Sequence, residues 1–355
     1  MNYDVIICGG GPAGSVCAAF CAAGGLKTLV LEKAVFPRDK VCGDCINPSC
    51  WPVLERLEVA GRVLALPHSK LAAVEFIGID GRSIKYPMHS SERGEIAVKR
   101  SVFDELLLQR AVECGAEVRQ NTVVTTVERG WKVYAGGEIF TSHSLVAADG
   151  RNSTIMRLLG SLPAATRERV AIQTHIPAPP DFSERVVLHF LKEGYAGYTS
   201  IGGGHVNLCL VSKPAGIPAL KKWAEARFEI APRQAWHTIT PLARDAVPAS
   251  ADNLLLAGDA ARVVEPYTGE GIYYAIASGE LAARHLCEKL PLDNYRREHA
   301  RLYAGRLWVN RISKTAVLHP RIASLVLDAM RFYPRSLQFL TSKVVGTALL
   351  SNADL

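Results

Sequence analysis

Three glycines near the N-terminus have the spacing of a dinucleotide-binding turn. Gly9, Gly11 and Gly14 follow directly on the apolar run of residues 4–8, with Pro12 and Ala13 between the last two. The first glycine permits a tight turn, the second lets a pyrophosphate approach the backbone, and the third allows close packing of helix on strand. The N-terminus of the following helix would offer N–H donors to the phosphates. This pattern predicts a dinucleotide site and does not by itself distinguish NAD from FAD.

An acidic side chain stands where such a site needs one. Glu32 comes 18 residues after Gly14, at the end of the second apolar run, 27–31, and is followed by Lys33. A carboxylate at this place accepts hydrogen bonds from the ribose hydroxyls of the adenosine. The glycines and Glu32 together predict a βαβ unit that begins at the third residue of the chain.

Two distant segments favour a flavin. Gly258 and Asp259 follow the apolar run 253–257, and a glycine-rich loop and a helix N-terminus come close behind. An anionic side chain there suits a ribityl chain, and N–H groups around residues 269–272 could face the electron-rich pyrimidine edge of the ring. Asp149, after the apolar run 144–148, is a second acid at a strand end. For Asp149 and Ser153, capping of a helix is an alternative interpretation.

The elements that must position these residues suggest two domains of an α/β protein. Apolar runs typical of buried strands alternate with segments of helical periodicity, which cover residues 15–23, 100–114 and those from about 271. This order predicts a Rossmann-like domain with a parallel sheet. Segments of alternating polar and apolar residues between them predict an inserted antiparallel sheet. The prediction is a discontinuous FAD-binding domain of residues 1–70, 98–165 and 245–290, a substrate domain of residues 71–97 and 166–244, and a C-terminal helical region of residues 291–355.

Composition excludes several other classes of protein. The chain has 355 residues, of which 48% are hydrophobic and 21% charged, so a disordered chain is excluded. A net charge of +7 without basic runs gives no reason to expect nucleic acid binding. Nine cysteines without regular spacing fit a reducing compartment, and the single CxxC of Cys42 and Cys45 lacks the partners of a metal site. Without a spanning run of about 20 apolar residues, we expect a cytoplasmic protein whose C-terminal helices either dock on the body or touch a membrane surface.

The loop of residues 36–44 and the Arg100, Phe103, Asp104 motif give the chain a family resemblance. It resembles the FAD-dependent group that contains geranylgeranyl reductases, flavin-dependent halogenases and aromatic hydroxylases, and most of all its reductase branch. The resemblance implies that the ADP half lies on the first glycine motif and Glu32, adenine near Val124, the ribityl on Asp259 and the flavin ring at the turn 266–272. The predicted FAD-binding residues are Gly9, Gly11, Pro12, Ala13, Gly14, Glu32, Lys33, Lys40, Arg100, Val124, Asp149, Gly258, Asp259, Pro266, Gly269, Gly271 and Ile272.

The resemblance implies hydride transfer through the flavin to reduce a double bond of a hydrophobic small molecule, such as an isoprenoid, polyketide or lipid. A hydroxylase that uses NAD(P)H and oxygen is the alternative. Halogenation is disfavoured because no Trp-x-Trp pair is present, and a flavoprotein without turnover is a further possibility. No second glycine motif is visible, so NAD(P)H would bind transiently or a reductase partner would supply electrons. Among Cys42, Cys45, Tyr195 and Tyr198, we select Cys45 and Tyr195 as candidate proton donors.

Overall fold

A parallel sheet forms the centre of the first domain in the computed structural model, which describes residues 2–88, 91–166, 169–180, 182–264 and 269–304. Residues 5–8, 29–31 and 254–256 of its strands are apolar and buried, as expected for parallel strands that helices cover. Their order is β20 (Leu254–Leu256), β11 (Glu138–Ala147), β1 (Asn2–Cys8), β2 (Thr28–Leu31) and β8 (Glu117–Arg119), all parallel. The antiparallel strands β9 (Val124–Glu128), β10 (Lys132–Ala135) and β19 (Ser250–Ala251) extend it.

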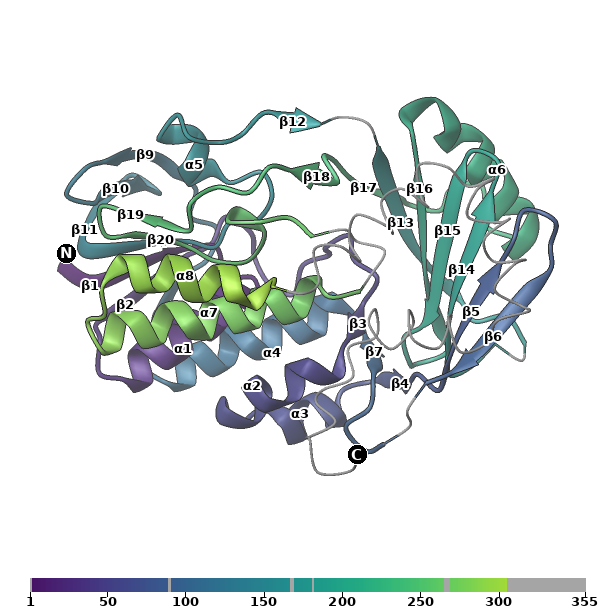
Figure 1. Ribbon diagram of the computed structural model, residues 1–355, viewed down its shortest axis with the longest axis horizontal. Helices are drawn as coiled ribbons and strands as arrows, with labels where there is room; N and C mark the ends of the chain where they lie inside the picture. The colour runs from purple at the N-terminus through teal and green to yellow at the C-terminus, as the bar shows by residue number, and fades with distance from the viewer. Residues whose placement is uncertain (1, 89–90, 167–168, 181, 265–268, 305–355) are drawn as a thin grey trace.

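Helices α1 (Pro12–Ala23), α4 (Arg100–Glu113), α7 (Gly271–Cys287) and α8 (Leu292–Leu302) gather beside this sheet (Figure 1). Small residues let α7 approach α1 closely, since a Cβ at Gly279 would lie 2.3 Å from the Ala13 carbonyl oxygen. This contact places the N-terminus of α7 beside the glycine turn that precedes α1.

The second domain is a seven-stranded sheet whose outer face is covered by α6 (Ile217–Phe228) (Figure 1). The expectation of an antiparallel sheet holds for every pair but one, since β14 and β5 run parallel. These two strands come from separate stretches of the chain, so no tight hairpin fixes their relative direction. The strand order is β17 (His237–Ile239), β13 (Val170–Pro177), β16 (His205–Ser212), β15 (Gly194–Ser200), β14 (Arg185–Leu191), β5 (Ala73–Ile77) and β6 (Ser83–Pro87).

A three-stranded sheet of β3 (Cys45–Ile46), β7 (Ile96–Val98) and β4 (His68–Lys70) lies between the two larger sheets (Figure 1). Of the predicted C-terminal helical region, α8 is present, and residues 305–355 lie outside the described residues. Within the described ranges, no helix is long and apolar enough to cross a membrane. The remaining elements are η1 (Pro48–Cys50), α2 (Trp51–Arg56), α3 (Ala60–Ala65), α5 (Thr154–Leu158), β12 (Ala165–Thr166), η2 (Pro214–Gly216), β18 (Ala243–Arg244) and η3 (Gly258–Ala260).

Candidate active site

A cavity of about 500 Å³ lies between the strand ends of the parallel sheet and the inner face of the seven-stranded sheet. It brings together residues that are far apart in the sequence. Gly14 is not among the residues that line it, and Pro266 lies outside the described residues. The predicted cofactor residues that line it are Gly9, Gly11, Pro12, Ala13, Glu32, Lys33, Lys40, Arg100, Val124, Asp149, Gly258, Asp259, Gly269, Gly271 and Ile272.

Two glycines of the turn, Gly9 and Gly14, have no room for a side chain. Gly9 has φ +104°, and a Cβ on it would lie 2.5 Å from the Ala148 carbonyl oxygen. A Cβ on Gly14 would lie 1.8 Å from the carbonyl oxygen of Gly9. Gly14 therefore acts through packing of α1 on the turn, as the spacing predicts, while Gly9 and Gly11 leave open backbone at the cavity.

Glu32 is a buried carboxylate at the end of β2. One oxygen accepts a 2.6 Å hydrogen bond from the Gly10 amide, and the other accepts a 2.8 Å bond from the Ala34 amide. A carboxylate has about four lone-pair sites, so two of them are available to ribose hydroxyls. The side chain thus fixes the glycine turn and lines the cavity.

Asp149 and Ser153 both cap α5. The Asp149 carboxylate accepts from the Ile155 amide at 3.0 Å, and the Ser153 hydroxyl accepts from the Met156 amide at 3.1 Å. Burial raises the pKa of Asp149, although hydrogen bonds to its carboxylate from the Ser153 side chain and the Ile155 amide oppose the shift. The capping interpretation is therefore correct for both residues, and Asp149 also lines the cavity.

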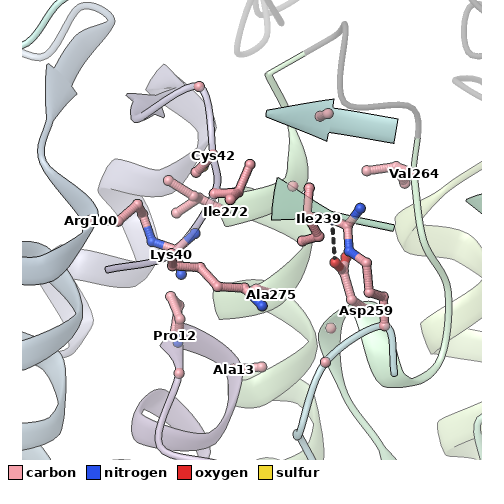
Figure 2. A pocket seen from close by; sticks show the side chains of 18 of the residues that line it. Pro12, Ala13, Lys40, Cys42, Arg100, Ile239, Asp259, Val264, Ile272 and Ala275 are labelled. Atoms are coloured by element: carbon pink, nitrogen blue, oxygen red, sulfur yellow. Dashed lines mark hydrogen bonds and ion pairs between the residues drawn. The ribbon is translucent and has the colours of Figure 1, made fainter. Parts of the chain in front are cut away.

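Basic side chains cross the middle of the cavity. Arg100 binds Asp104 through two hydrogen bonds of 2.6 and 2.8 Å, and Arg151 binds Asp259 at 2.9 Å. Lys40 reaches between Arg100 and Asp259 (Figure 2). Burial, and then the positive charges of Arg100 and Arg151, lower the pKa of Lys40 to about 8. This concentration of positive charge suits a diphosphate.

Sequence reasoning missed Arg151, although its position two residues after Asp149 at a strand end was a usable signal. Arg38, in the loop of residues 36–44, is a further basic residue of this region. In the structure Arg38 lies 3.2 Å from the buried Asp104 and shares that carboxylate with Arg100. Asp104 thereby orders both guanidinium groups at the rim of the cavity.

The opposite wall belongs to the seven-stranded sheet and is mostly apolar. Along β15 every second residue, Tyr195, Gly197 and Thr199, lines the cavity. Tyr198 lies on the other face, where its ring packs 5.2 Å from that of Phe228, so this candidate donor does not reach the cavity. Further apolar residues of this wall are Val74, Phe76, Ala171, Val186, Leu188, Val211, Ile239 and Leu242.

A polar network fastens the loop of Cys42 to this wall. The Cys42 amide donates to the Gln173 side chain at 3.2 Å, and the Cys42 carbonyl accepts from the Asn207 amide group at 2.7 Å. Asp44, in the same loop, lies 3.1 Å from His175. The sequence analysis left these partners unassigned, because the cross-strand pairing that aligns them is visible only in the fold.

The two selected donor candidates, Cys45 and Tyr195, are buried in the cavity lining. Burial and nearby acidic groups raise the pKa of the Cys45 thiol well above its ordinary value. A Cβ on Gly269 would lie 3.9 Å from that of Cys45, so the β3 strand adjoins the turn before α7. A group of three or more metal-ligating side chains was not found among the described residues.

The lining fits FAD in shape and charge. The glycine turn has backbone open to the cavity, where the phosphates would lie, and Glu32 would face the ribose. Asp259 and the N-terminus of α7 lie at the other end of the same cavity. When bound, FAD supplies hydride transfer. The chain would hold it through the glycine turn, Glu32, the basic cluster and Asp259.

Comparisons with known proteins agree with this site. The FAD binding domain family model matches residues 2–194. The menaquinone reductase of Mycolicibacterium smegmatis is 31% identical over 309 residues, 79% of this chain and 75% of that protein. The geranylgeranyl diphosphate reductase of Rhodobacter capsulatus is 30% identical over 315 residues, 80% of this chain and 74% of that protein.

Among solved structures, the flavin-dependent brominase Bmp2 superposes with a TM-score of 0.78 at 22% identity, covering 96% of this chain and 94% of that chain. The structure of PqsL from Pseudomonas aeruginosa with 2-aminobenzoylacetate gives 0.79 at 20% identity, covering 92% and 100%. These likenesses confirm the predicted fold. The family match and the two reductase relatives complete the identification: the chain belongs to the FAD binding domain family and is an FAD-dependent oxidoreductase.

Proposed function

We propose that the protein reduces a carbon–carbon double bond in a polyisoprenoid or similar lipid-like molecule. One observation carries this proposal, namely that the cavity for FAD continues without a break onto an apolar wall formed by Phe76, Val186 and Leu188. Such a wall binds a hydrocarbon chain by removing it from water, and only a few polar groups are then needed for orientation.

The relatives support the same substrate class. Their names include menaquinone reductase, geranylgeranyl diphosphate reductase and digeranylgeranylglycerophospholipid reductase. Menaquinone, geranylgeranyl diphosphate and digeranylgeranylglycerophospholipid all carry isoprenoid chains with double bonds. The residues of this chain would hold that hydrocarbon against the apolar wall, with its double bond at the Gly269–Ile272 end of the cavity.

NAD(P)H or a reductase partner would supply the electrons, and peripheral contact with a membrane would bring the protein near a lipid substrate. Both belong to the proposal. The basic cluster of Lys40 and Arg100 fits the phosphates of FAD and thereby leaves the apolar wall for the substrate.

An anaerobic single turnover tests the function. FAD-loaded protein is photoreduced without oxygen and mixed with geranylgeranyl diphosphate or with menaquinone of four isoprene units. Because the quinone ring of menaquinone can itself accept two electrons from reduced flavin, the product is reoxidised to the quinone before its mass is measured. Flavin reoxidation together with a product whose isoprenoid chain is two mass units heavier supports reduction. Product that forms only after oxygen is admitted, and that contains an added oxygen atom, overturns it in favour of a monooxygenase. Reoxidation without either product favours a flavoprotein of another kind.

A further inference from the structure

Glu95 is a buried carboxyl group in the wall of the cavity. It directly precedes β7 and is 9% exposed. Its backbone carbonyl accepts a hydrogen bond from the Leu71 amide at 2.9 Å, which fixes the residue at the start of the central strand of the small sheet. Its side chain lines the same cavity as Cys45 and Ile272. Sequence reasoning did not select Glu95, because nothing in its neighbourhood resembles a motif.

The surroundings of Glu95 disfavour a negative charge. Its Oε2 atom is buried, and no described residue offers it a hydrogen bond. Within the described ranges, no ion pair includes this carboxyl group. A buried carboxylate without a partner is strongly disfavoured, so such a group takes up a proton instead.

The titratable groups that face Glu95 are acids and thiols. Glu270, at the N-terminal end of α7, is 1% exposed, and Cys45 of β3 and Cys50 of η1 also lie close enough to interact with Glu95 electrostatically. Burial, and secondly the charge of Glu270, raise the pKa of Glu95 to about 8. At neutral pH the group is therefore a protonated acid, whose pKa is well matched to proton transfer.

Glu95 also stands at the end of the cavity where the chemistry is expected. Strands β3 and β7 are antiparallel, and Ile46 of β3 pairs with Ile96 of β7. Glu95, the residue before Ile96, therefore lies just past the end of β3, the strand that carries Cys45. Cys45 in turn adjoins Gly269. The carboxyl group therefore belongs to the end formed by the turn before α7, away from the Glu32 end.

We propose that Glu95 is the acid that gives the substrate its proton in the reduction of the double bond, a role that rests on the proposed function. One carbon of the double bond gains a hydride with its electron pair from reduced flavin, which is oxidised. The other carbon gains the proton as the O–H bond of Glu95 breaks, leaving a carboxylate. Water reprotonates this carboxylate after the product leaves, so the sum of the step is two electrons and two protons.

Glu95 suits this step better than the candidates selected from the sequence. The Cys45 thiol has a pKa raised well above its ordinary value by burial, which makes it a weak donor at neutral pH. A tyrosine hydroxyl such as that of Tyr195 starts from a pKa of about 10. The carboxylic acid of Glu95 is the better donor because its pKa lies nearer to neutral pH.

Infrared spectroscopy tests the protonation state without any turnover. FAD-loaded wild-type protein is compared with Glu95→Gln between pH 6 and pH 9. We expect a carbonyl band of a protonated carboxyl group that is present in wild type at pH 6, decreases near pH 8 and is absent from the variant. If wild type and variant give the same carboxyl bands at pH 6, Glu95 is ionised and the inference is overturned.

The anaerobic turnover with geranylgeranyl diphosphate tests the role, because this compound has no quinone ring that could reoxidise the flavin by another route. Reoxidation of the photoreduced flavin should be at least about 30-fold slower in Glu95→Gln, and Glu95→Asp should recover part of the rate because it restores an acid. Glu75→Gln, which removes a carboxylate that pairs with Arg185 outside the cavity, should react at the wild-type rate. Retained flavin absorbance in each variant shows that folding and FAD binding are intact.

The two proposals fail in different ways. If wild type reduces neither compound, the proposed function is wrong, and the role of Glu95 falls with it even where the infrared band is present. If wild type reduces a compound and Glu95→Gln does so equally fast, only the role of Glu95 is wrong. If Glu95→Gln loses flavin absorbance, the Glu95→Asp variant is used to test the role instead. The inference is overturned if Glu95→Asp reoxidises its flavin at least as fast as wild type and with the same dependence on pH.

Discussion

The Asp44 carboxylate lies 3.1 Å from Nε2 of His175, and this contact joins the loop of Cys42 to the seven-stranded sheet. Asp44 is fully buried and has φ +61°, so the loop is held in a left-handed conformation. Burial raises the pKa of Asp44, and His175 opposes that shift. Removing His175 therefore leaves a buried carboxylate without its main partner.

We predict that His175→Phe lowers the free energy of unfolding by about 3 kcal/mol at pH 8. The folded-state pKa of Asp44, already raised, would rise further. Because the folded variant would bind a proton on Asp44 at a higher pH than the unfolded chain does, its free energy of unfolding should rise again as the pH falls through the folded-state pKa of Asp44. Urea unfolding at pH 5.5 and pH 8 measures the difference. The double variant Asp44→Asn with His175→Phe should recover stability at pH 8, and an equal loss at both pH values would contradict the account.

Asn207 and Gln173 hold both backbone polar groups of Cys42. We predict that Asn207→Leu costs about 1–3 kcal/mol of stability, since the Cys42 carbonyl loses its amide donor and keeps only the weaker Cys209 thiol at 3.3 Å. The variant should also weaken FAD binding several-fold because the loop carries Lys40. Equilibrium titration with FAD measures the affinity. Gln234→Met is the control, because it removes bonds to Thr174 and the His175 carbonyl away from the loop. It should lower stability and leave FAD affinity unchanged, and equal affinity loss in both variants would contradict the role of Asn207.

Much of the nucleotide site was predictable from the sequence because its signals are local. The glycine spacing and the distance to Glu32 both lie within one βαβ unit, where turn geometry and strand ends fix the positions of side chains. Arg100 and Asp104 are likewise one helical turn apart on α4. The helical period places residues four apart on the same face of a helix, so a contact such as that between Arg100 and Asp104 can be predicted from sequence spacing.

The rest of the site depends on contacts between distant segments. Asp44 and His175 are separated by 131 positions, and they meet because the loop of Cys42 docks on β13, where Gln173 also binds it. Glu95 is conspicuous through its burial, and no sequence pattern distinguishes a buried glutamate from an exposed one. The parallel pairing of β5 with β14 is also a property of the assembled sheet.

Lys40 should make FAD binding depend on pH. Its pKa is lowered to about 8 by burial and by neighbouring cations, and the diphosphate favours the protonated form. Binding of FAD therefore takes up a proton above pH 8, and the affinity for FAD should fall up to about tenfold per pH unit between pH 8 and pH 10.

Lys40→Met should bind FAD at least about tenfold more weakly than wild type at pH 7, and its affinity should depend less on pH. Lys221→Met, whose ammonium lies 3.7 Å from Glu225 on α6, where neither residue lines the cavity, should keep the wild-type profile. Parallel slopes in all three proteins would refute the assignment.

Gly14→Ala should abolish FAD loading. The added Cβ would lie 1.8 Å from the Gly9 carbonyl oxygen, so either α1 or the glycine turn must move away from the phosphate site. Gly61→Ala is the matched control, because this helical glycine has nothing within 4 Å of its Cβ position and alanine should stabilise α3 by about 0.5–1 kcal/mol. Flavin absorbance after purification measures both. Full flavin content in Gly14→Ala would show that the turn tolerates a side chain.

Gly197 leaves a gap in the apolar wall, and filling it should shorten the substrates that fit. A Cβ there would touch Leu188 at 3.6 Å and Tyr195 at 3.9 Å, which is ordinary contact, so Gly197→Ala should have little effect. Gly197→Phe would place a ring in the cavity in front of Leu188.

For Gly197→Phe, we predict an increase of at least about tenfold in KM for geranylgeranyl diphosphate and a much smaller increase for geranyl diphosphate. The affinity for FAD should be unchanged, because the nucleotide would bind at the other wall. Steady-state assays with the two chain lengths measure the ratio. An equal rise in KM for geranylgeranyl diphosphate and geranyl diphosphate would show that the hydrocarbon chain of the substrate binds elsewhere. A ring at position 197 can hinder only the part of the substrate that extends over this wall.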